Sequence, residues 1–572
     1  MELCFIWIEN YKGFINQGFN FDTENNYNYS ISDNTVQKSK NEYYIKNLFS
    51  PEITNITGII GKNASGKTNI LELIQYVSDG ANTILNKPFF AIYKSEQEFI
   101  IYNFKMPAIK NNFDAENKSY DGRIPETDTI YFSNVFDGRR HNFGKKTINI
   151  STNDLLISQF GENVTKNYQK TIQQQIKFIK DPKFELLEDV ERFMHPGQKV
   201  SSLKPTTVVL TSPIWSNIIG RIRNFDERFE RATERKVNFK SFALNFKRKI
   251  TDNNSANSIK YLTAFLVYVD FMLNRDILIF SGNKVFKEKS DYFDMVYSLL
   301  KITQDDSRID EIYKFLTTDF PKIIDSYWNV PETHKFLIDL PEFKIINEKN
   351  EEFKESLGSY SNRRIQFTLN YNTEVGNFLT KYLDATTNQS LSYSIDWGGI
   401  SSGHKAYINL FASFFARKSQ IKEDNVLIAI DEGDLYFHPK WQTQFLSKLI
   451  IILPKLINKK CQLFLTTHSP FLISDLPKNN LLFVAKDYND KLYVIPNEKM
   501  IEVKTFGGNI GELYLDAFFM EGSLVSSFAE RKIREIINKI NNKQESISKE
   551  DRILISEIGD ELLRTQLQNL IK

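Results

Sequence analysis

A glycine-rich loop at residues 61–69, GKNASGKTN, constrains the fold of this chain more than any other feature. It contains the pattern G-x-x-x-x-G-K-[ST], in which backbone N–H groups and a lysine surround phosphate groups. The pattern requires a strand before the loop and a helix after it. The apolar run ITNITGIIG, 53–61, leads into the loop, and SGKTNILELIQYVSDG, 65–80, follows with apolar residues at helical spacing. We therefore expect a phosphate-binding strand, loop and helix over 53–80.

Each residue type in this loop has its own chemical role. Gly61 and Gly66 let the backbone wrap closely around phosphates. We expect Lys67 to place its ammonium on the β- and γ-phosphates and Thr68 to offer its hydroxyl to Mg²⁺. The predicted nucleotide-binding residues of the loop are Gly61, Lys62, Asn63, Ala64, Ser65, Gly66, Lys67, Thr68 and Asn69. ATP and Mg²⁺ are therefore the expected cofactors.

Two later apolar runs end in polar residues that suit the same site. VLIAIDEGD, 426–434, and LFLTTHSP, 463–470, are typical of parallel strands buried on both faces. Alone, the acids are typical of a solvated strand end and a single histidine is more often structural. Beside the glycine loop, Asp431 is expected to hold Mg²⁺ and Glu432 to act as general base. His468 is expected to reach the γ-phosphate, which makes Glu432, His468 and Lys67 the predicted catalytic set.

The stretch ISSGHKAYINLF, 400–411, has two interpretations. The plain one is an amphipathic helix that is capped by a serine and has a helpful glycine turn. The functional one is that a serine and a helix N-terminus face an anion. Its position before the two-acid strand favours the second interpretation, with Ser402 and Gly403 at the start of the helix.

The order of these motifs resembles that of the ATP-binding-cassette heads of the SMC and RecF group. The shared order is glycine loop, long insertion, SSGHKA, AIDE and TTH. Asn63 and Asn69 match these heads, and IENYKGF is similar to their first strand, with Lys12 as its basic loop residue and a further expected nucleotide contact. Asn134, in YFSNVF, is the candidate for their glutamine loop.

That resemblance implies a site completed by a second subunit. In this group two heads enclose two ATP molecules, so Ser402 and Gly403 of one subunit would contact the γ-phosphate held by Lys67 of the other. ATP would then act as a dimerisation switch, because it binds the closed state more tightly. Two residues depart from the pattern: Ala64 replaces a loop glycine, and His404 stands where relatives carry Glu or Gln.

The second half of the chain resembles a narrower family. DEGDLYFHPKWQ, 431–442, is similar to a run in compact OLD-like ATPases, and the tail 504–533 is similar to that of PtuA-like ATPases from Septu-type anti-phage systems, which also accompany certain retrons. This implies an ATPase that oligomerises and holds a separate HNH-type nuclease, PtuB-like, and is not itself a nuclease. A retron would add a reverse transcriptase and an RNA–DNA hybrid.

Two other functions remain open at this point. One is a RecF-like DNA-repair ATPase clamp. The other is an OLD-type ATPase with its own nuclease activity, which would need a metal-binding acidic domain after the TTH strand. The acids of KDYND, Asp487 and Asp490, are more economically explained as a surface turn.

The pattern of apolar residues predicts an α/β nucleotide-binding head, split by a helical insertion and followed by a helical appendage, and the resemblance above implies that the head is of ABC type. We expect the first part of the head at 1–149, a mainly helical insertion at 150–355, the second part of the head at 356–498, and a C-terminal region for oligomer or partner contacts at 499–572. No apolar heptad pattern persists for three or four repeats, so no long coiled coil is expected.

Charge and composition limit the partners. The 572 residues carry a net charge of +2 and only two cysteines, Cys4 and Cys461, which fits a cytoplasmic protein. The most apolar stretch, 261–280, is broken by charged residues and is expected to be a buried helix, not a membrane span. The segment Arg221–Lys249 has ten basic and four acidic residues, a local +6, and could contact nucleic acid. Its five phenylalanines are either core residues or stacking platforms.

Overall fold

The computed structural model describes most of the chain. It leaves out residues 81–84, 96–97, 136–140, 145, 158–163, 195–201, 235, 237, 253–257, 281–308, 323–330, 342–344, 352–363, 387–390, 497–503, 517–525, 543–546 and 572.

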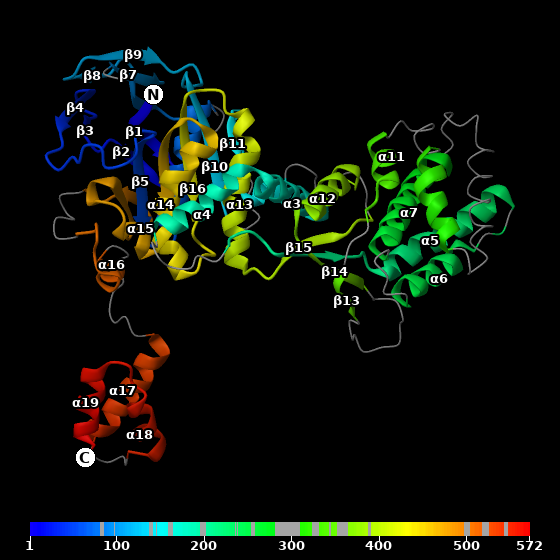
Figure 1. Cartoon of the computed structure of the whole chain (residues 1–572). Helices are drawn as coiled ribbons and strands as arrows, with labels where there is room; N and C mark the ends of the chain where they lie inside the picture. Colours follow the sequence, from blue (N-terminus) through cyan, green and yellow to red (C-terminus); the bar gives the residue numbers. More distant parts are fainter. Residues whose placement is uncertain are drawn as a thin grey trace.

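A twelve-stranded sheet forms the centre of the head (Figure 1). Six of its strands run parallel in the order β11-β10-β16-β17-β5-β18. Their bounds are β5 (Ile53–Gly61), β10 (Thr127–Ser133), β11 (Thr147–Asn149), β16 (Asn425–Asp431), β17 (Lys460–Thr466) and β18 (Leu481–Lys486). The predicted α/β fold is confirmed, and the continuous apolar runs form neighbouring parallel strands.

Helices cover both faces of this parallel sheet. The helix α1 (Lys67–Asp79) packs on one face, whereas α13 (Ser402–Arg417), α14 (Pro439–Ile457) and α15 (Pro470–Ser474) belong to the core on the other. Successive residues of β5 alternate between the two cores: Ile59 faces α1 and Ile60 faces away from it. α1 ends at Gly80, whose φ of 82° and close approach to the Gly122 carbonyl leave no room for a side chain.

The rest of the sheet is largely antiparallel and continues as β19-β2-β1-β6-β7-β9. These strands are β1 (Glu2–Tyr11), β2 (Phe14–Asn20), β6 (Phe89–Ser95), β7 (Glu98–Phe104), β9 (Ala115–Ser119) and β19 (Leu492–Val494). A small separate sheet contains β3 (Asn25–Ser30), β4 (Thr35–Lys40) and β8 (Lys110–Asn111). β19 pairs with β2 and so joins the second part of the head to the first hairpin.

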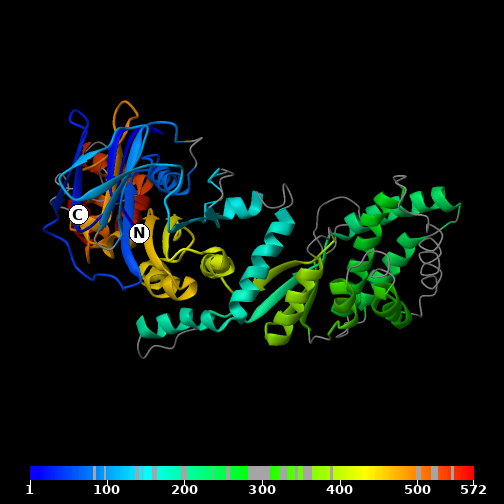
Figure 2. The ribbon, with the colours of Figure 1, turned by 90° about the horizontal axis from the view of Figure 1, so that it is seen from above.

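The insertion combines helices with a second sheet and extends away from the head (Figure 2). Its sheet has the order β13-β14-β12-β15, with β12 (Thr207–Thr211), β13 (Ile345–Glu351), β14 (Arg364–Asn370) and β15 (Ser394–Gly398). The boundary expected at 355 falls between two strands of this sheet, and the domain division stays a prediction. The helices are α2 (Thr152–Ile157), α3 (Val164–Lys180), α4 (Glu185–Met194), α5 (Trp215–Thr233), α6 (Phe239–Asp252), α7 (Ser258–Phe280), α9 (Ile309–Lys314), α11 (Pro331–Ile338) and α12 (Thr373–Thr386).

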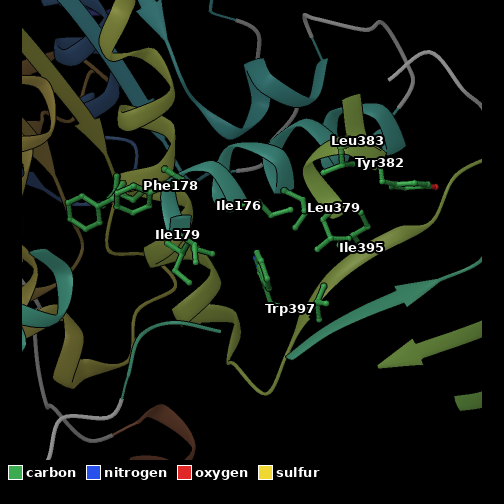
Figure 3. Packing of buried hydrophobic residues seen from close by; sticks show 14 of the residues in the cluster. Ile176, Phe178, Ile179, Leu379, Tyr382, Leu383, Ile395 and Trp397 are labelled. Atoms are coloured by element: carbon green, nitrogen blue, oxygen red, sulfur yellow. The ribbon is translucent and has the colours of Figure 1, made fainter. Parts of the chain in front are cut away.

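The helix α3 connects the head to the insertion. Toward the insertion, Ile176 packs with Leu379 of α12 and Ile395 of β15 in one apolar cluster (Figure 3). Toward the head, the Phe178 ring lies 5.4 Å from that of Phe415 on α13. One continuous core therefore runs from the parallel sheet into the insertion.

The C-terminal region has two parts. α16 (Ile510–Asp516) packs against α15 of the head. α17 (Ser527–Asn542), α18 (Lys549–Ser556) and α19 (Glu561–Leu570) share a small apolar cluster of their own, in which Ile536, Ile555, Ile558 and Leu567 are buried.

The stretch 261–280 forms most of α7, as predicted. Residues 259–269 include eight fully or nearly fully buried apolar side chains, so this part of the helix is core. Within the described part of the chain, no helix has the length and apolarity that a bilayer span requires.

Candidate nucleotide-binding site

The glycine loop has the backbone geometry that phosphate binding requires. A Cβ atom at Gly61 would lie 2.3 Å from the Val484 carbonyl oxygen, so only glycine fits there. Gly66 has φ 90° and is the N-cap of α1. Ala64 has φ 61°, in the left-handed region that glycine occupies at lower cost. The departure at Ala64 therefore keeps the loop conformation and adds local strain.

Lys67 lies inside this loop. Its Nζ donates to the carbonyls of Gly61 at 3.0 Å and Lys62 at 3.4 Å. Burial lowers the pKa of Lys67, although the carboxylates of Glu432 and Asp431 act in the opposite direction. Lys62 and Asn63 are exposed residues of the loop. Ser65 is buried, and its hydroxyl has no hydrogen-bond partner among the described residues. A buried ammonium next to N–H groups at a helix start suits an anionic ligand.

Asp431, at the end of β16, is surrounded by hydroxyl groups. The Thr68 hydroxyl lies 3.1 and 3.2 Å from its two carboxylate oxygens. Thr466 donates to Oδ1 at 2.5 Å and Tyr131 to Oδ2 at 3.3 Å. Burial raises the pKa of Asp431, although these hydrogen bonds act in the opposite direction.

This donor set fits a magnesium ion. Carboxylate and hydroxyl oxygens are hard ligands, and Mg²⁺ at phosphate sites uses one or two protein groups together with phosphate oxygens and water. Thr68 and Asp431 meet that requirement because they are already adjacent. A divalent cation would also offset the cost of burying the carboxylate of Asp431.

Glu432 and His468 are in direct contact. His468 Nε2 lies 3.2 Å from Glu432 Oε1, and both side chains are partly exposed. The Glu432 backbone has φ 48° and donates its N–H to Thr466 Oγ1 at 3.0 Å. A left-handed backbone is strained at a residue other than glycine, and such strained residues cluster at functional sites. The predicted catalytic group of Lys67, Glu432 and His468 thus lies at one edge of the sheet.

A cavity of about 110 Å³ opens beside Glu432 and His468. Its lining consists of Glu432, Asp434, Leu435, Gln442, His468, Ser469 and Tyr514. Tyr514 comes from α16, which the neighbouring Thr505 helps to fix by donating to the Leu476 carbonyl at 2.7 Å. The C-terminal region therefore contributes a side chain to the edge of the site, which the sequence did not predict.

Lys12 and Asn69, linked above only by resemblance, lie together. Lys12 and Gly13 form a two-residue hairpin turn with φ 43° and 94° between β1 and β2. Asn69 Nδ2 donates to the Lys12 carbonyl at 3.4 Å, and the Lys12 ammonium is paired with Glu72 on the next turn of α1. The hairpin is thus anchored to the helix that begins at the glycine loop.

Ser402 and Gly403 lie on a different element from the loop, at the start of α13. The N-cap is Ser401, whose hydroxyl accepts the His404 N–H at 3.2 Å, while Ser402 is exposed. A Cβ at Gly403 would lie 2.7 Å from the Tyr436 carbonyl oxygen. The glycine thus permits close packing of α13 against the segment after the two acids.

His404 is buried. It stands where heads of the SMC and RecF group carry Glu or Gln. Its Nε2 donates to the Leu203 carbonyl of the insertion at 2.7 Å, and its ring lies 5.4 Å from Trp441. Burial lowers the pKa of His404. The side chain therefore joins α13 to the insertion within the subunit.

Asn134 follows β10, whose Ser133 pairs with Asp431. Its side-chain amide donates to the Gly433 carbonyl at 3.1 Å. The position beside the two-acid strand is the one that a glutamine loop would need, and that role stays a prediction.

The basic segment Arg221–Lys249 covers most of α5 and most of α6. Its five phenylalanines are buried against each other and α7: Phe225, Phe229, Phe239, Phe242 and Phe246. They are core residues and not stacking platforms. The exposed basic side chains described are Arg221, Arg223, Arg228, Arg231, Lys236 and Lys240, and several pair with acids of α5 at 3.6–4.0 Å. Arg235 and the side chains of Arg248 and Lys249 lie outside the described residues.

The acids of KDYND form a turn, as expected. Asp487 accepts the N–H groups of Asn489 and Lys491, both at 2.8 Å, and Asp490 pairs with Lys486.

Sequence reasoning missed Thr466, Tyr131 and Glu72. One signal was available, since Glu72 is a charged residue within the apolar run ILELI.

Comparisons with known proteins agree with this geometry. The model of the AAA ATPase domain family matches residues 1–473. The Septu protein PtuA of Bacillus thuringiensis is 35% identical over 80 residues, 14% of this chain and 19% of that protein. The Retron Vc95 probable ATPase of Vibrio cholerae serotype O1 biovar El Tor is 31% identical over 122 residues, 20% of this chain and 22% of that protein. The chain thus aligns with about a fifth of these curated relatives, and the predicted resemblance to Septu and retron ATPases is confirmed.

Proposed function

Because this chain belongs to the AAA ATPase domain family, we propose that it binds and hydrolyses ATP as a subunit of a cytoplasmic anti-phage defence complex. The observation that carries the proposal is the convergence of polar groups from distant parts of the sequence. Lys67 and Thr68 follow β5. Asp431 ends β16, Glu432 comes directly after it and His468 follows β17, more than 360 residues later.

These side chains have complementary roles in hydrolysis. The Lys67 ammonium compensates the charge of the β- and γ-phosphates. Thr68 and Asp431 would hold Mg²⁺, which would supply positive charge to neutralise the charge that develops on the phosphate oxygens. Glu432 accepts a proton from the attacking water, and His468, 3.2 Å away, fixes the Glu432 carboxylate and faces the γ-phosphate.

A second copy completes the site. Ser402 is exposed at a helix N-terminus whose cap uses Ser401, so its hydroxyl and the helix dipole can serve a phosphate on another subunit. Leu435 and Tyr436 are 43% and 50% exposed beside the site, and a partner head would cover them. ATP then favours the closed head-to-tail dimer, or a larger assembly, since it contacts both subunits.

The closed assembly holds and restrains a separate HNH-type nuclease of PtuB type, and this chain is not itself the nuclease. The names of the two relatives support a defence system, either Septu or retron. In a retron the assembly also includes a reverse transcriptase and its RNA–DNA hybrid. The helices α17–α19 supply contacts, because Phe528, Ile553 and Leu562 are more than half exposed there.

A RecF-like clamp on DNA is the second candidate, and the basic surface of α5 and α6 favours it. Because the phenylalanines are buried, contact would be with phosphates and would weaken steeply with salt. Nucleic-acid binding that is strong, dependent on ATP and lost in Arg221→Glu/Lys240→Glu would favour the clamp. Metal-dependent cleavage of DNA by the purified chain alone would instead favour an OLD-type nuclease.

The Glu432→Gln variant tests the ATPase proposal. Removing the general base is expected to slow hydrolysis about 10²–10⁴-fold while ATP binding persists. The matched control is Glu423→Gln, just before the opposite end of β16, which should hydrolyse ATP at the wild-type rate. Hydrolysis and binding are measured by phosphate release and by filter binding. Wild-type turnover in Glu432→Gln would refute the assignment of the base.

The partner is tested by co-expression with the product of the neighbouring reading frame. If that product is an HNH protein, we expect a stable complex by size-exclusion chromatography and DNA cleavage only by the complex. Glu432→Gln should retain the closed assembly with ATP, so its mass should exceed that of the nucleotide-free chain. Equal masses with and without ATP would contradict the dimerisation switch.

A further inference from the structure

A buried chain of polar side chains continues from Asp431 away from the phosphate loop. Two of the hydroxyls on Asp431, from Thr68 and Thr466, belong to the expected surroundings of such an aspartate. The third belongs to Tyr131, which is fully buried on β10, the strand next to β16. Nothing in the mechanism above uses this tyrosine.

Tyr131 is held by His141. The His141 ring lies 4.8 Å from the Tyr131 ring, and its Nε2 is 3.5 Å from the Tyr131 hydroxyl. The hydroxyl has one proton, and a charged carboxylate is the stronger acceptor, so this proton is donated to Asp431 and the hydroxyl oxygen is left as the acceptor that faces His141 Nε2. His141 also stacks on Phe143 with an interplanar angle of 8°, which fixes the imidazole plane.

His141 is in turn held by Glu72. The Nδ1–H group donates to Glu72 Oε1 at 2.9 Å, and both side chains are buried, 8% and 6% exposed. The other oxygen of Glu72 accepts from the Tyr11 hydroxyl at 3.2 Å and from the Lys12 ammonium. Although burial acts in the opposite direction, the hydrogen bonds from His141 and Lys12 lower the pKa of Glu72.

We propose that Tyr131, His141 and Glu72 are positioning residues of the ATP site, which fix the Asp431 carboxylate for Mg²⁺ and tie it to the Lys12 hairpin. Glu72 is central because its two carboxylate oxygens contact both sides of this series of hydrogen bonds. One oxygen contacts His141, which leads to Asp431, and the other contacts Lys12 of the hairpin. Groups that hydrogen-bond to a metal-binding carboxylate set its orientation, and their loss commonly weakens metal affinity about 10–100-fold. The inference rests on the proposed Mg·ATP site.

The test measures binding of a fluorescent, non-hydrolysable ATP analogue to the full chain, in EDTA and over a titration with Mg²⁺. Tyr131→Phe keeps the ring against His141 and Phe143 and removes only the hydroxyl. We expect its Mg²⁺ half-saturation to rise about tenfold, with unchanged analogue affinity in EDTA. Because binding is read without turnover, the result does not depend on hydrolysis.

The matched control is Tyr120→Phe. Tyr120 is also buried, but its hydroxyl donates to the Tyr76 and Val77 carbonyls at the far end of α1. Its loss should leave the Mg²⁺ half-saturation unchanged, whereas a general loosening of α1 would shift both variants alike. A second variant, Glu72→Gln, should weaken Mg²⁺ binding and also analogue binding in EDTA, because Lys12 loses its anchor.

The outcomes separate this inference from the proposed function. If the wild type binds the analogue no better with Mg²⁺ than in EDTA, the proposed ATP site fails and this inference fails with it. Suppose that Mg²⁺ promotes analogue binding by the wild type and that Tyr131→Phe has the same Mg²⁺ half-saturation concentration. Only the positioning role is then refuted. Equal shifts in Tyr131→Phe and Tyr120→Phe would also refute it.

Discussion

Replacing Asp475 by Asn should stabilise the protein increasingly as the pH rises. Asp475 follows α15, a few residues beyond His468, and its Oδ2 atom is buried with no hydrogen-bond partner among the described residues. Burial raises the pKa of Asp475 from 3.8 to about 6. The native state therefore disfavours the carboxylate, and the substitution puts a neutral amide in its place.

The pH dependence and the size of this stabilisation follow from the difference between the folded-state and unfolded-state pKa values of Asp475. The folded-state pKa lies above the unfolded one, so between pH 4 and pH 6 the native state binds more protons, and its stability falls as the pH rises through that window. The two values differ by about 2, and each unit corresponds to about 1.4 kcal/mol, which sets an upper limit of about 3 kcal/mol. Because Asp475 is only partly buried, we expect Asp475→Asn to gain about 1–2 kcal/mol at pH 7.

Thermal or urea unfolding at several pH values between 4.5 and 8 measures the difference. A matched control is Asp424→Asn, since Lys459 holds the pKa of Asp424 below its ordinary value at the surface. That variant should gain nothing as the pH rises. If the advantage of Asp475→Asn is the same at pH 4.5 and pH 7, or if the variant is less stable at pH 7, the carboxylate is not an isolated buried charge and the reasoning is refuted.

Four other substitutions test the loop, α13 and the basic segment. Ala64→Gly should stabilise the chain by up to about 1 kcal/mol, because Ala64 has φ 61°; a lower melting temperature would contradict this. Gly403→Ala should reduce ATP turnover but not ATP binding, since its Cβ would meet the Tyr436 carbonyl at 2.7 Å; unchanged turnover would oppose it. Phe225→Ala should cost about 3–5 kcal/mol by urea unfolding, whereas exposed Lys240→Ala should change stability by less than about 0.5 kcal/mol.

The elements around the glycine loop were predictable because their signals are local. β5, β16 and β17 are continuous apolar runs, and such runs favour parallel strands with helices on both faces. The end of α1 at Gly80 follows from the left-handed backbone that glycine adopts there. The polar residues after these strands then had to meet, because parallel strands place their carboxyl ends at one edge.

The sheet of the insertion was not predictable in the same way. β12 is only five residues long and pairs with β14 and β15, more than 150 residues further along the chain. No turn between adjacent strands fixes that register, so the sequence around β12 contains no local signal for its partners. The phenylalanines of α5 and α6 were equally ambiguous, since helical spacing alone does not say which side faces α7.

The unpredicted part of the site has the same origin. Tyr131, His141 and Glu72 come from a strand, a loop and a helix, and each is a common residue in its local sequence. Only the packing of α1 against β10 brings them into one hydrogen-bonded chain. The tyrosine of α16 beside Glu432 likewise depends on how the C-terminal region packs, and not on any motif.

The position of α13 suggests how ATP binding at the head would reach the insertion. Its first residues, Ser402 and Gly403, are those proposed to meet the nucleotide of a second subunit. Further along, Asn409 accepts a hydrogen bond from Gln175 of α3 at 3.3 Å, and Gln175 also accepts from the Trp397 indole at 2.7 Å. Since a close-packed interior transmits displacement, a shift of α13 in the proposed head closure would move α3 and β15 with it. The same helix would therefore complete the partner's site and set the position of the insertion.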